Sequence, residues 1–233
     1  MLTVIVCLWE GGQYVPERSR IFTPEWADKL YRGIARNYNK PFRFVCLTHY
    51  PQSSFKEPVE AISFLHDTRK WTCINEIFRP DLGIEKGIFM GLDTIITGDL
   101  TEIFDNDFKN FCMIEIVKER HNVLKKVICN AVVIFNAESG AKLWGRWQID
   151  EHRIHRMSGM IIKECVSEMQ WQVWAVKKLN IKMLLLNKLY PGQIASWRLT
   201  LNNDIANLKD SRIVYFHGSY KPDNCPGAWE YWI

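Results

Sequence analysis

The sequence predicts an α/β protein with a mostly parallel central sheet flanked by helices. Apolar runs at 2–8, 42–47 and 88–90 do not alternate with polar residues, which is typical of strands buried on both faces of a sheet. An amphipathic segment at 24–37 separates the first two runs, as in a β-α-β crossover. A chain of 233 residues can bury a sizeable core, and we expect a single domain over 1–233.

The first half of the chain begins with this crossover. Thr23 is the expected N-cap of the helix and Pro24 its first residue. The Gly11-Gly12 pair in the preceding loop could let the backbone approach a nucleotide, or it could form an ordinary turn. The expected elements are strand 2–8, helix 24–37, strand 42–47, a short strand 59–62, helix 69–78 and strand 88–90.

In the second half, apolar strands again alternate with a helical region. A polar amide, Asn130, interrupts the run 127–135, so it must either find hydrogen bonds inside the protein or face a cavity. The expected elements are strands 111–117 and 127–135, a helical region over 139–179, strand 182–189, a turn at 190–193 and strand 212–216.

Asp93 is the first candidate for chemistry, because it follows the buried strand 88–90 directly. Ligands of open α/β sheets bind at the carboxyl ends of strands. A second acid nearby has a structural explanation: Asp99 can cap a short helix while Glu102 reaches back to it, as in a capping box. Asp93 is therefore the carboxylate without a structural task.

Composition narrows the class of protein. Hydrophobic residues make up 47% and charged residues 24%, which are globular values, and no apolar run reaches the roughly 18 to 20 residues of a membrane span. The net charge of +4 permits a phosphate ligand without indicating nucleic acid. Without a targeting pattern at the N-terminus, we expect a soluble cytoplasmic protein, in the host cytoplasm if it is viral.

The cysteines, histidines and tryptophans of this sequence can each be explained by a structural role or by a functional one. Seven cysteines without a C-x-x-C pair indicate reduced, structural thiols. His152 and His155 could ligate a metal, but two histidines beside arginines more often form a solvated helix face. The ten tryptophans could stack on sugars or bases, although packing is the expected role of most of them.

The whole chain resembles the GT-A glycosyltransferases, and within them small bacterial and phage enzymes distantly similar to the glycogenin-like family. The resemblance rests on five segments that occur in the same order over nearly the full length. They are Trp9-Glu10-Gly11-Gly12-Gln13-Tyr14 after the first strand, and the segments 41–48, 92–100, 190–197 and 216–222.

The resemblance implies a metal-assisted transfer of a sugar. The family's Asp-x-Asp motif, which binds Mn²⁺ or Mg²⁺, here reads Gly91-Leu92-Asp93, so that only the directly coordinating carboxylate is kept. His217 matches the second metal ligand and Lys221 the lysine that pairs with the diphosphate. Together with a hard cation these residues would hold the donor, a UDP- or GDP-sugar.

Other family positions imply contacts with the substrate. Asn130 matches the amide that faces the donor sugar, and Glu168-Met169-Gln170 replaces a Gly-Asp-Gln motif whose acid contacts the transferred sugar. The residues expected to be catalytic are Asp93, Asn130, Glu168 and Gln170, and those expected to bind substrate are Cys7, Trp9, Tyr14, Leu92, Gly218 and Lys221.

Three functions are compatible with these features. The first is a glycosyltransferase acting on an unidentified glycan, protein or modified-base acceptor. The second is a catalytically weakened relative that binds nucleotide sugars, which Gly91 and Met169 favour. The third is an α/β domain with an unrelated ligand, which leaves Asp93, His217 and Lys221 unexplained.

Overall fold

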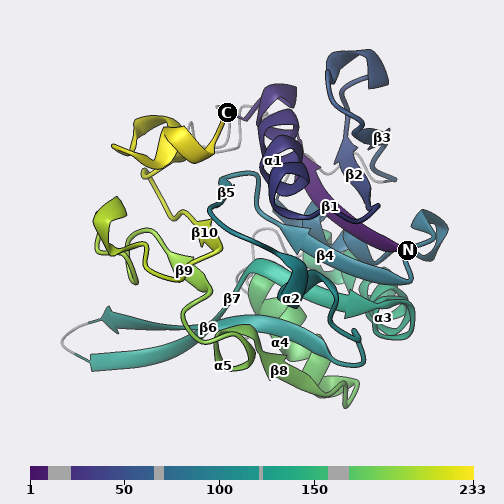
Figure 1. Ribbon diagram of the computed structural model, residues 1–233. Coiled ribbons are helices and arrows are strands. Elements are labelled where there is room, and N and C mark those ends of the chain that lie inside the picture. Colours follow the sequence, from purple (N-terminus) through teal and green to yellow (C-terminus); the bar gives the residue numbers. More distant parts are fainter. Residues whose placement is uncertain (10–21, 66–70, 121–122, 157–167) are drawn as a thin grey trace.

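The computed structural model describes residues 1–9, 22–65, 71–120, 123–156 and 168–233, without side chains for 71, 118–120, 123 and 151–156. In this part of the chain a seven-stranded sheet has the order β3-β2-β1-β4-β7-β6-β8 (Figure 1). Its strands are β1 (Leu2–Leu8), β2 (Arg43–Thr48), β3 (Glu60–Ile62), β4 (Lys86–Met90), β6 (Phe111–Arg120), β7 (Val123–Asn136) and β8 (Met183–Leu185).

Most neighbours in this sheet run parallel, as the sequence predicts. Strand β1 pairs in parallel with β2 and β4, β2 with β3, and β6 with β8. Strand β7 is antiparallel to both β4 and β6. The hairpin of β6 and β7 extends well beyond the body of the protein (Figure 1). A smaller sheet contains β5 (Thr94–Ile96), β10 (Ile213–Tyr215) and β9 (Ile194–Ser196), in the order β5-β10-β9.

Helices cover both faces of the large sheet, which explains the continuous apolar runs. All seven residues of β1 are buried. Val4, Val6 and Leu8 pack on the side of helix α1 (Pro24–Asn37), whereas Ile5 and Cys7 belong to the core on the opposite side. That second core is covered by the 3-10 helix η3 (Trp71–Phe78) and by α3 (Ala137–Arg156) and α4 (Glu168–Lys178).

The tryptophans and cysteines are mainly structural, as expected. Six tryptophans are buried in the two cores: Trp26, Trp144, Trp147, Trp171, Trp197 and Trp232. The six described cysteines are buried, and Cys165 lies outside the described residues. The side chains of His152 and His155 are likewise not described. Among the described residues, no helix is both long and apolar enough to cross a membrane.

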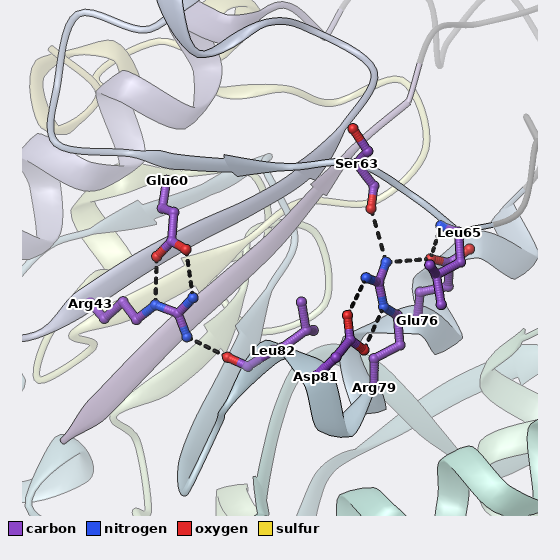
Figure 2. A network of polar contacts seen from close by, with 8 residues as sticks. All are labelled: Arg43, Glu60, Ser63, Leu65, Glu76, Arg79, Asp81 and Leu82. Carbon is purple, nitrogen blue, oxygen red and sulfur yellow. Dashed lines mark hydrogen bonds and ion pairs between the residues drawn. The ribbon is translucent and has the colours of Figure 1, made fainter.

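A buried polar network fixes η3 beside the sheet (Figure 2). The Arg79 guanidinium donates to Glu76 Oε2 at 3.0 Å and to the Ser63 carbonyl at 2.9 Å, and it also pairs with Asp81. Glu76 Oε2 accepts from the backbone N–H of Leu65 at 2.7 Å. Because the Arg79 and Glu76 side chains are almost fully buried, losing one partner would leave an uncompensated charge inside the protein. The network therefore holds η3 against the loop that follows β3.

The element boundaries are confirmed for β1 and α1, and the N-cap position of Thr23 is correct, although its side chain makes no capping hydrogen bond. The expected strand 182–189 is wrong beyond residue 185, where helix α5 (Leu186–Leu189) begins. There the side chain of Asn187 accepts the Glu115 N–H at 3.1 Å, in place of a strand carbonyl. Strands β5 and β9, each of three residues, are too short for the sequence pattern to predict.

The helical region expected over 139–179 contains the helices α3 and α4, with residues 157–167 not described. The helix expected at 69–78 needs correction, because the described part of this segment is the 3-10 helix η3, with residues 69–70 not described. The predicted capping box at Asp99 is half correct. Asp99 accepts the Thr101 N–H at 3.0 Å, but Glu102 instead accepts from the Gln193 amide at 2.8 Å, which ties helix α2 (Thr101–Phe104) to the turn before β9.

Gly87 gives a direct test of this packing. It lies on β4 opposite Phe135 of β7, and a Cβ atom at residue 87 would lie 2.4 Å from the Phe135 ring. We expect Gly87→Ala to lower the free energy of unfolding by about 1 to 3 kcal/mol, measured by urea denaturation. In the control Gly145→Ala, on the exposed face of α3 with nothing within 4 Å, stability should rise by up to about 1 kcal/mol. Equal effects of the two substitutions would contradict the packing described here.

Candidate active site

A cavity of about 480 Å³ opens where several strands end. Strands β1 and β4 are parallel neighbours, so their carboxyl ends reach the same edge of the sheet. Strand β7 runs antiparallel to β4, and the Gly91 N–H continues the ladder by donating to Ala131 O at 3.0 Å. The described lining residues are Cys7, Leu8, Trp9, Phe22, Ile74, Phe89, Met90, Gly91, Leu92, Asp93, Cys129, Asn130, Ala131, Phe216, His217, Gly218 and Lys221.

The small sheet brings the last part of the chain to this edge. Strand β10 is antiparallel to β5, with Tyr215 opposite Thr94. The ladder continues for one more residue, because the Phe216 N–H donates to Asp93 O at 3.2 Å. His217 follows immediately and also lines the cavity. Two side chains that are 124 positions apart in the sequence are therefore brought to one cavity by a short backbone ladder.

Asp93 forms an ion pair with Lys221. The Lys221 ammonium donates to Asp93 Oδ2, and both side chains are largely buried, at 9% and 18% exposed respectively. Asp93 is the only carboxylate and Lys221 the only lysine or arginine among the described residues of the cavity wall. Each charge thus compensates the other in surroundings where an unpaired charge is costly.

Hydrogen bonds hold the backbone around Lys221, and the Lys221 ammonium contacts an aromatic ring in addition to its ion pair with Asp93. The Lys221 N–H donates to Asn224 Oδ1 at 2.8 Å, and the Asn224 amide donates to Ser219 O at 3.0 Å. Gly218 has a φ of +65°, which favours glycine in the turn that leads to Lys221. The ammonium lies 5.5 Å from the centre of the Phe22 ring, a cation–π contact.

Gly91 leaves little room for a larger residue. A Cβ atom there would lie 3.0 Å from Asp93 Oδ1, so that Asp93 would have to shift by a few tenths of an ångström. Of the histidine, aspartate, glutamate and cysteine side chains on the described wall, Asp93 and His217 are the two that are not cysteines. No group of three or more histidine, cysteine, aspartate or glutamate side chains in the described chain is arranged to hold a metal ion.

A second polar pair lies at the β7 side of the cavity. The amide of Asn130, on the wall, donates to Glu168 Oε1 on α4 at 3.4 Å. Burial raises the pKa of Glu168 above its usual range, although hydrogen bonds from backbone N–H groups and from Asn130 oppose the shift. Burial also raises the pKa of the Cys7 thiol well above its usual range, with a smaller contribution from Cys73, so Cys7 presents a neutral surface to the cavity.

The structure brings together most residues that the sequence singled out. Gln170 is exposed on α4 and does not line the cavity, and Tyr14 lies outside the described residues, as do Gly11 and Gly12. Sequence reasoning missed Phe22, whose contact with Lys221 spans most of the chain and leaves no local pattern. The expected residues that do line the cavity are Cys7, Trp9, Leu92, Asp93, Asn130, His217, Gly218 and Lys221.

No protein-family model matches this sequence, and no curated protein is similar enough to count as a relative. Solved structures, in contrast, share its fold. The chain is similar to the galactosyltransferase LgtC, solved in complex with donor and acceptor sugar analogues, with a TM-score of 0.62 at 10% identity. The match covers 98% of this chain and 93% of LgtC.

Two further glycosyltransferase structures are similar over a smaller part of their own length. GlyE of Streptococcus pneumoniae TIGR4 matches with a TM-score of 0.61 at 16% identity, over 99% of this chain and 60% of GlyE. The bifunctional glycosyltransferase WbbM matches with a TM-score of 0.54 at 11% identity, over 95% of this chain and 46% of WbbM. At these identities the likeness concerns the fold, and the fold of this chain is that of the GT-A glycosyltransferases.

Proposed function

We propose that this chain is a glycosyltransferase, a single GT-A domain over 1–233 that moves a sugar from a nucleotide-diphosphate donor to an acceptor. The observation that carries the proposal is the cavity at the carboxyl ends of β1 and β4. The described part of its wall combines one carboxylate, one imidazole and one ammonium group, which suits a diphosphate and its counter-ion. We further propose that it belongs with the small bacterial or phage enzymes that resemble the glycogenin-like family.

Asp93 and His217 are the proposed protein ligands of a divalent cation, Mn²⁺ or Mg²⁺. A carboxylate oxygen and an imidazole nitrogen suit such an ion, and both belong to the wall of one cavity. Two protein ligands do not fill an octahedral shell, so donor phosphates and water would supply the rest. When bound, the ion would neutralise the charge that develops on the leaving nucleoside diphosphate.

The remaining roles follow from position on the wall. Lys221 would pair with the diphosphate, since it is the only lysine or arginine on the described wall. Asn130, oriented by Glu168 at 3.4 Å, would face the transferred sugar. Glu168 and Gln170 are the proposed catalytic residues of the segment Glu168-Met169-Gln170, which replaces the family's Gly-Asp-Gln motif. Trp9 and Tyr14 would border the base and ribose, and Cys7, Leu92 and Gly218 would contact the donor.

The donor would be a UDP- or GDP-sugar and the acceptor a glycan, a protein or a modified base. A weakened protein that binds the donor without transferring the sugar is the second candidate. Gly91 favours this second candidate, because the family carries a carboxylate at this position. The ion pair of the Lys221 ammonium with Asp93 also favours it.

Thermal unfolding of the protein with a panel of nucleotide sugars, with and without Mn²⁺, tests the proposal. A ligand that binds only the folded state raises the melting temperature, so one nucleoside diphosphate class should do so in the presence of Mn²⁺. Release of nucleoside diphosphate from the same donor then separates a transferase from a binding protein. No response to any nucleotide sugar would contradict both candidates.

Removal of Asp93 should abolish the effect of metal on nucleotide binding. In the wild-type protein Mn²⁺ should raise nucleoside diphosphate affinity by a factor of roughly 5 to 150, measured by calorimetric titration. In Asp93→Ala this factor should fall to one. Asp99→Ala, which removes the carboxylate that accepts the Thr101 N–H, serves as control and should keep the full metal effect. A metal effect that persists in Asp93→Ala would exclude Asp93 as the ligand.

Gly91→Asp should restore part of the metal motif at a cost to the metal-free protein. Since residue 91 lies close to Asp93 Oδ1, two carboxylates there would repel each other until a cation binds between them. We expect a lower melting temperature without metal and a larger rise on addition of Mn²⁺ than in the wild type. Gly91→Asn has the same shape but no charge. It should lower the melting temperature through the close approach of its side chain to Asp93, without a larger response to Mn²⁺ than the wild type. If both variants respond alike to Mn²⁺, the added carboxylate does not reach the ion.

Glu168→Gln should change the pH dependence of stability. The pKa of Glu168 is raised in the folded protein, so the folded state binds this proton more tightly than the unfolded chain. Its contribution to stability is therefore lost as the pH rises through the ordinary carboxyl range toward the raised folded pKa. Relative to the wild type, Glu168→Gln should gain stability as the pH rises above about 4, the ordinary pKa of a glutamate, measured by urea unfolding. Parallel curves for the two proteins would show that Glu168 is not a buried acid.

A further inference from the structure

Lys221 and a divalent cation have the same partner, the Asp93 carboxylate. The ammonium occupies Asp93 Oδ2, and Oδ1 lies on the side of Gly91. A cation bound by Asp93 beside Lys221 would face a like charge across a few ångströms of largely buried space, where repulsion is strong. Lys221 therefore competes with metal for Asp93.

The construction of the segment allows the ammonium to move while its backbone stays in place. Hydrogen bonds with Asn224 fix both the N–H and the carbonyl of Lys221, at 2.8 and 3.1 Å. The side chain beyond them is a four-carbon stem with rotatable bonds, and its charged end contacts Asp93 and Phe22, which both line the cavity. A donor diphosphate in that cavity carries more negative charge than Asp93 and would attract the ammonium away from it.

We propose that Lys221 exchanges partners when the donor binds. Its ammonium neutralises Asp93 in the nucleotide-free protein and transfers to the diphosphate when nucleotide enters, which leaves Asp93 available to the cation. This inference rests on the proposed function and deepens it. It assigns to Lys221, beyond its contact with phosphate, a positioning role that makes metal binding depend on nucleotide.

The exchange also explains how Asp93 can be a largely buried carboxylate although the described wall offers few other metal ligands. Without Lys221, Asp93 would be a largely buried carboxylate with no lysine or arginine beside it on the described wall, and such a charge is costly unless it pairs with a cation. With Lys221 in place, the nucleotide-free site is neutral and has little affinity for a free ion.

The test measures Mn²⁺ binding to the nucleotide-free protein by electron paramagnetic resonance, so that it requires neither donor nor activity. Lys221→Met removes the charge but keeps an unbranched stem, and it should bind Mn²⁺ at least about fivefold more tightly than the wild type, the lower end of typical coupling factors. Adding Asp93→Asn to Lys221→Met should abolish the gain. Lys221→Arg, which keeps the charge, should bind Mn²⁺ as weakly as the wild type.

A second lysine with the same kinds of contact, one aromatic ring and one carboxylate, provides the control. Lys29 lies 4.1 Å from the centre of the Trp232 ring and forms an ion pair with Glu25, not with Asp93. Lys29→Met should leave Mn²⁺ affinity unchanged, and an equal gain there would mean that general electrostatics, rather than competition at Asp93, is responsible. Melting temperatures establish that each variant is folded, and if Lys221→Met does not fold, Lys221→Gln replaces it.

The outcomes separate this inference from the proposed function. The proposed exchange is overturned if folded Lys221→Met binds Mn²⁺ no more tightly than the wild type, or binds no measurable Mn²⁺. This conclusion would hold even if the protein proves to be a transferase. Tighter Mn²⁺ binding in Lys221→Met, with weaker nucleoside diphosphate binding and a smaller metal effect on it, supports the exchange. If the wild type binds no nucleoside diphosphate at all, the proposed function fails and the diphosphate half of the exchange fails with it.

Discussion

The short antiparallel ladder between β5 and β10 is the constraint on which the site depends. Three residue pairs join the middle of the chain to its last part, with further hydrogen bonds from Phe216 N–H to Asp93 O at one end and from Thr97 N–H to Arg212 O at the other. This ladder fixes the backbone on both sides of the cavity, so that Asp93, His217 and Lys221 line one wall. Without it, the large sheet would still present Asp93 at its edge, but the two basic side chains would have no defined position.

The described wall of the cavity carries few charged groups, and this limits the ligands that the cavity can bind. Most of the described wall consists of apolar side chains, with a single carboxylate and a single ammonium group that neutralise each other. In such surroundings a polyanionic ligand would meet one ammonium group and a carboxylate that needs a new partner once that ammonium is engaged. In the proposed function, this one ion pair would link the binding of a diphosphate to the binding of a metal ion.

Much of the large sheet could be predicted because its signals are local. The apolar run of β1, and the Thr23-Pro24 start and repeating apolar residues of α1, depend on residues close in sequence, and both elements have the predicted bounds. The three-residue strands β5 and β9 carry no such periodic signal, and they form because the β10 backbone is available to pair with them. The end of β8 is likewise decided by a distant group, since Asn187 takes the hydrogen bond of Glu115.

By itself the sequence determined the α/β class, the order of the principal elements and the candidate carboxylate, because buried strands and amphipathic helices are written in nearest-neighbour patterns. It also supplied His217, Lys221 and Asn130 through the resemblance to the GT-A glycosyltransferases. Only the tertiary structure decided that Lys221 lies on Asp93 and against Phe22. These contacts join residues 128 and 199 positions apart, and such pairs are set by how sheets and loops pack, which no local pattern encodes.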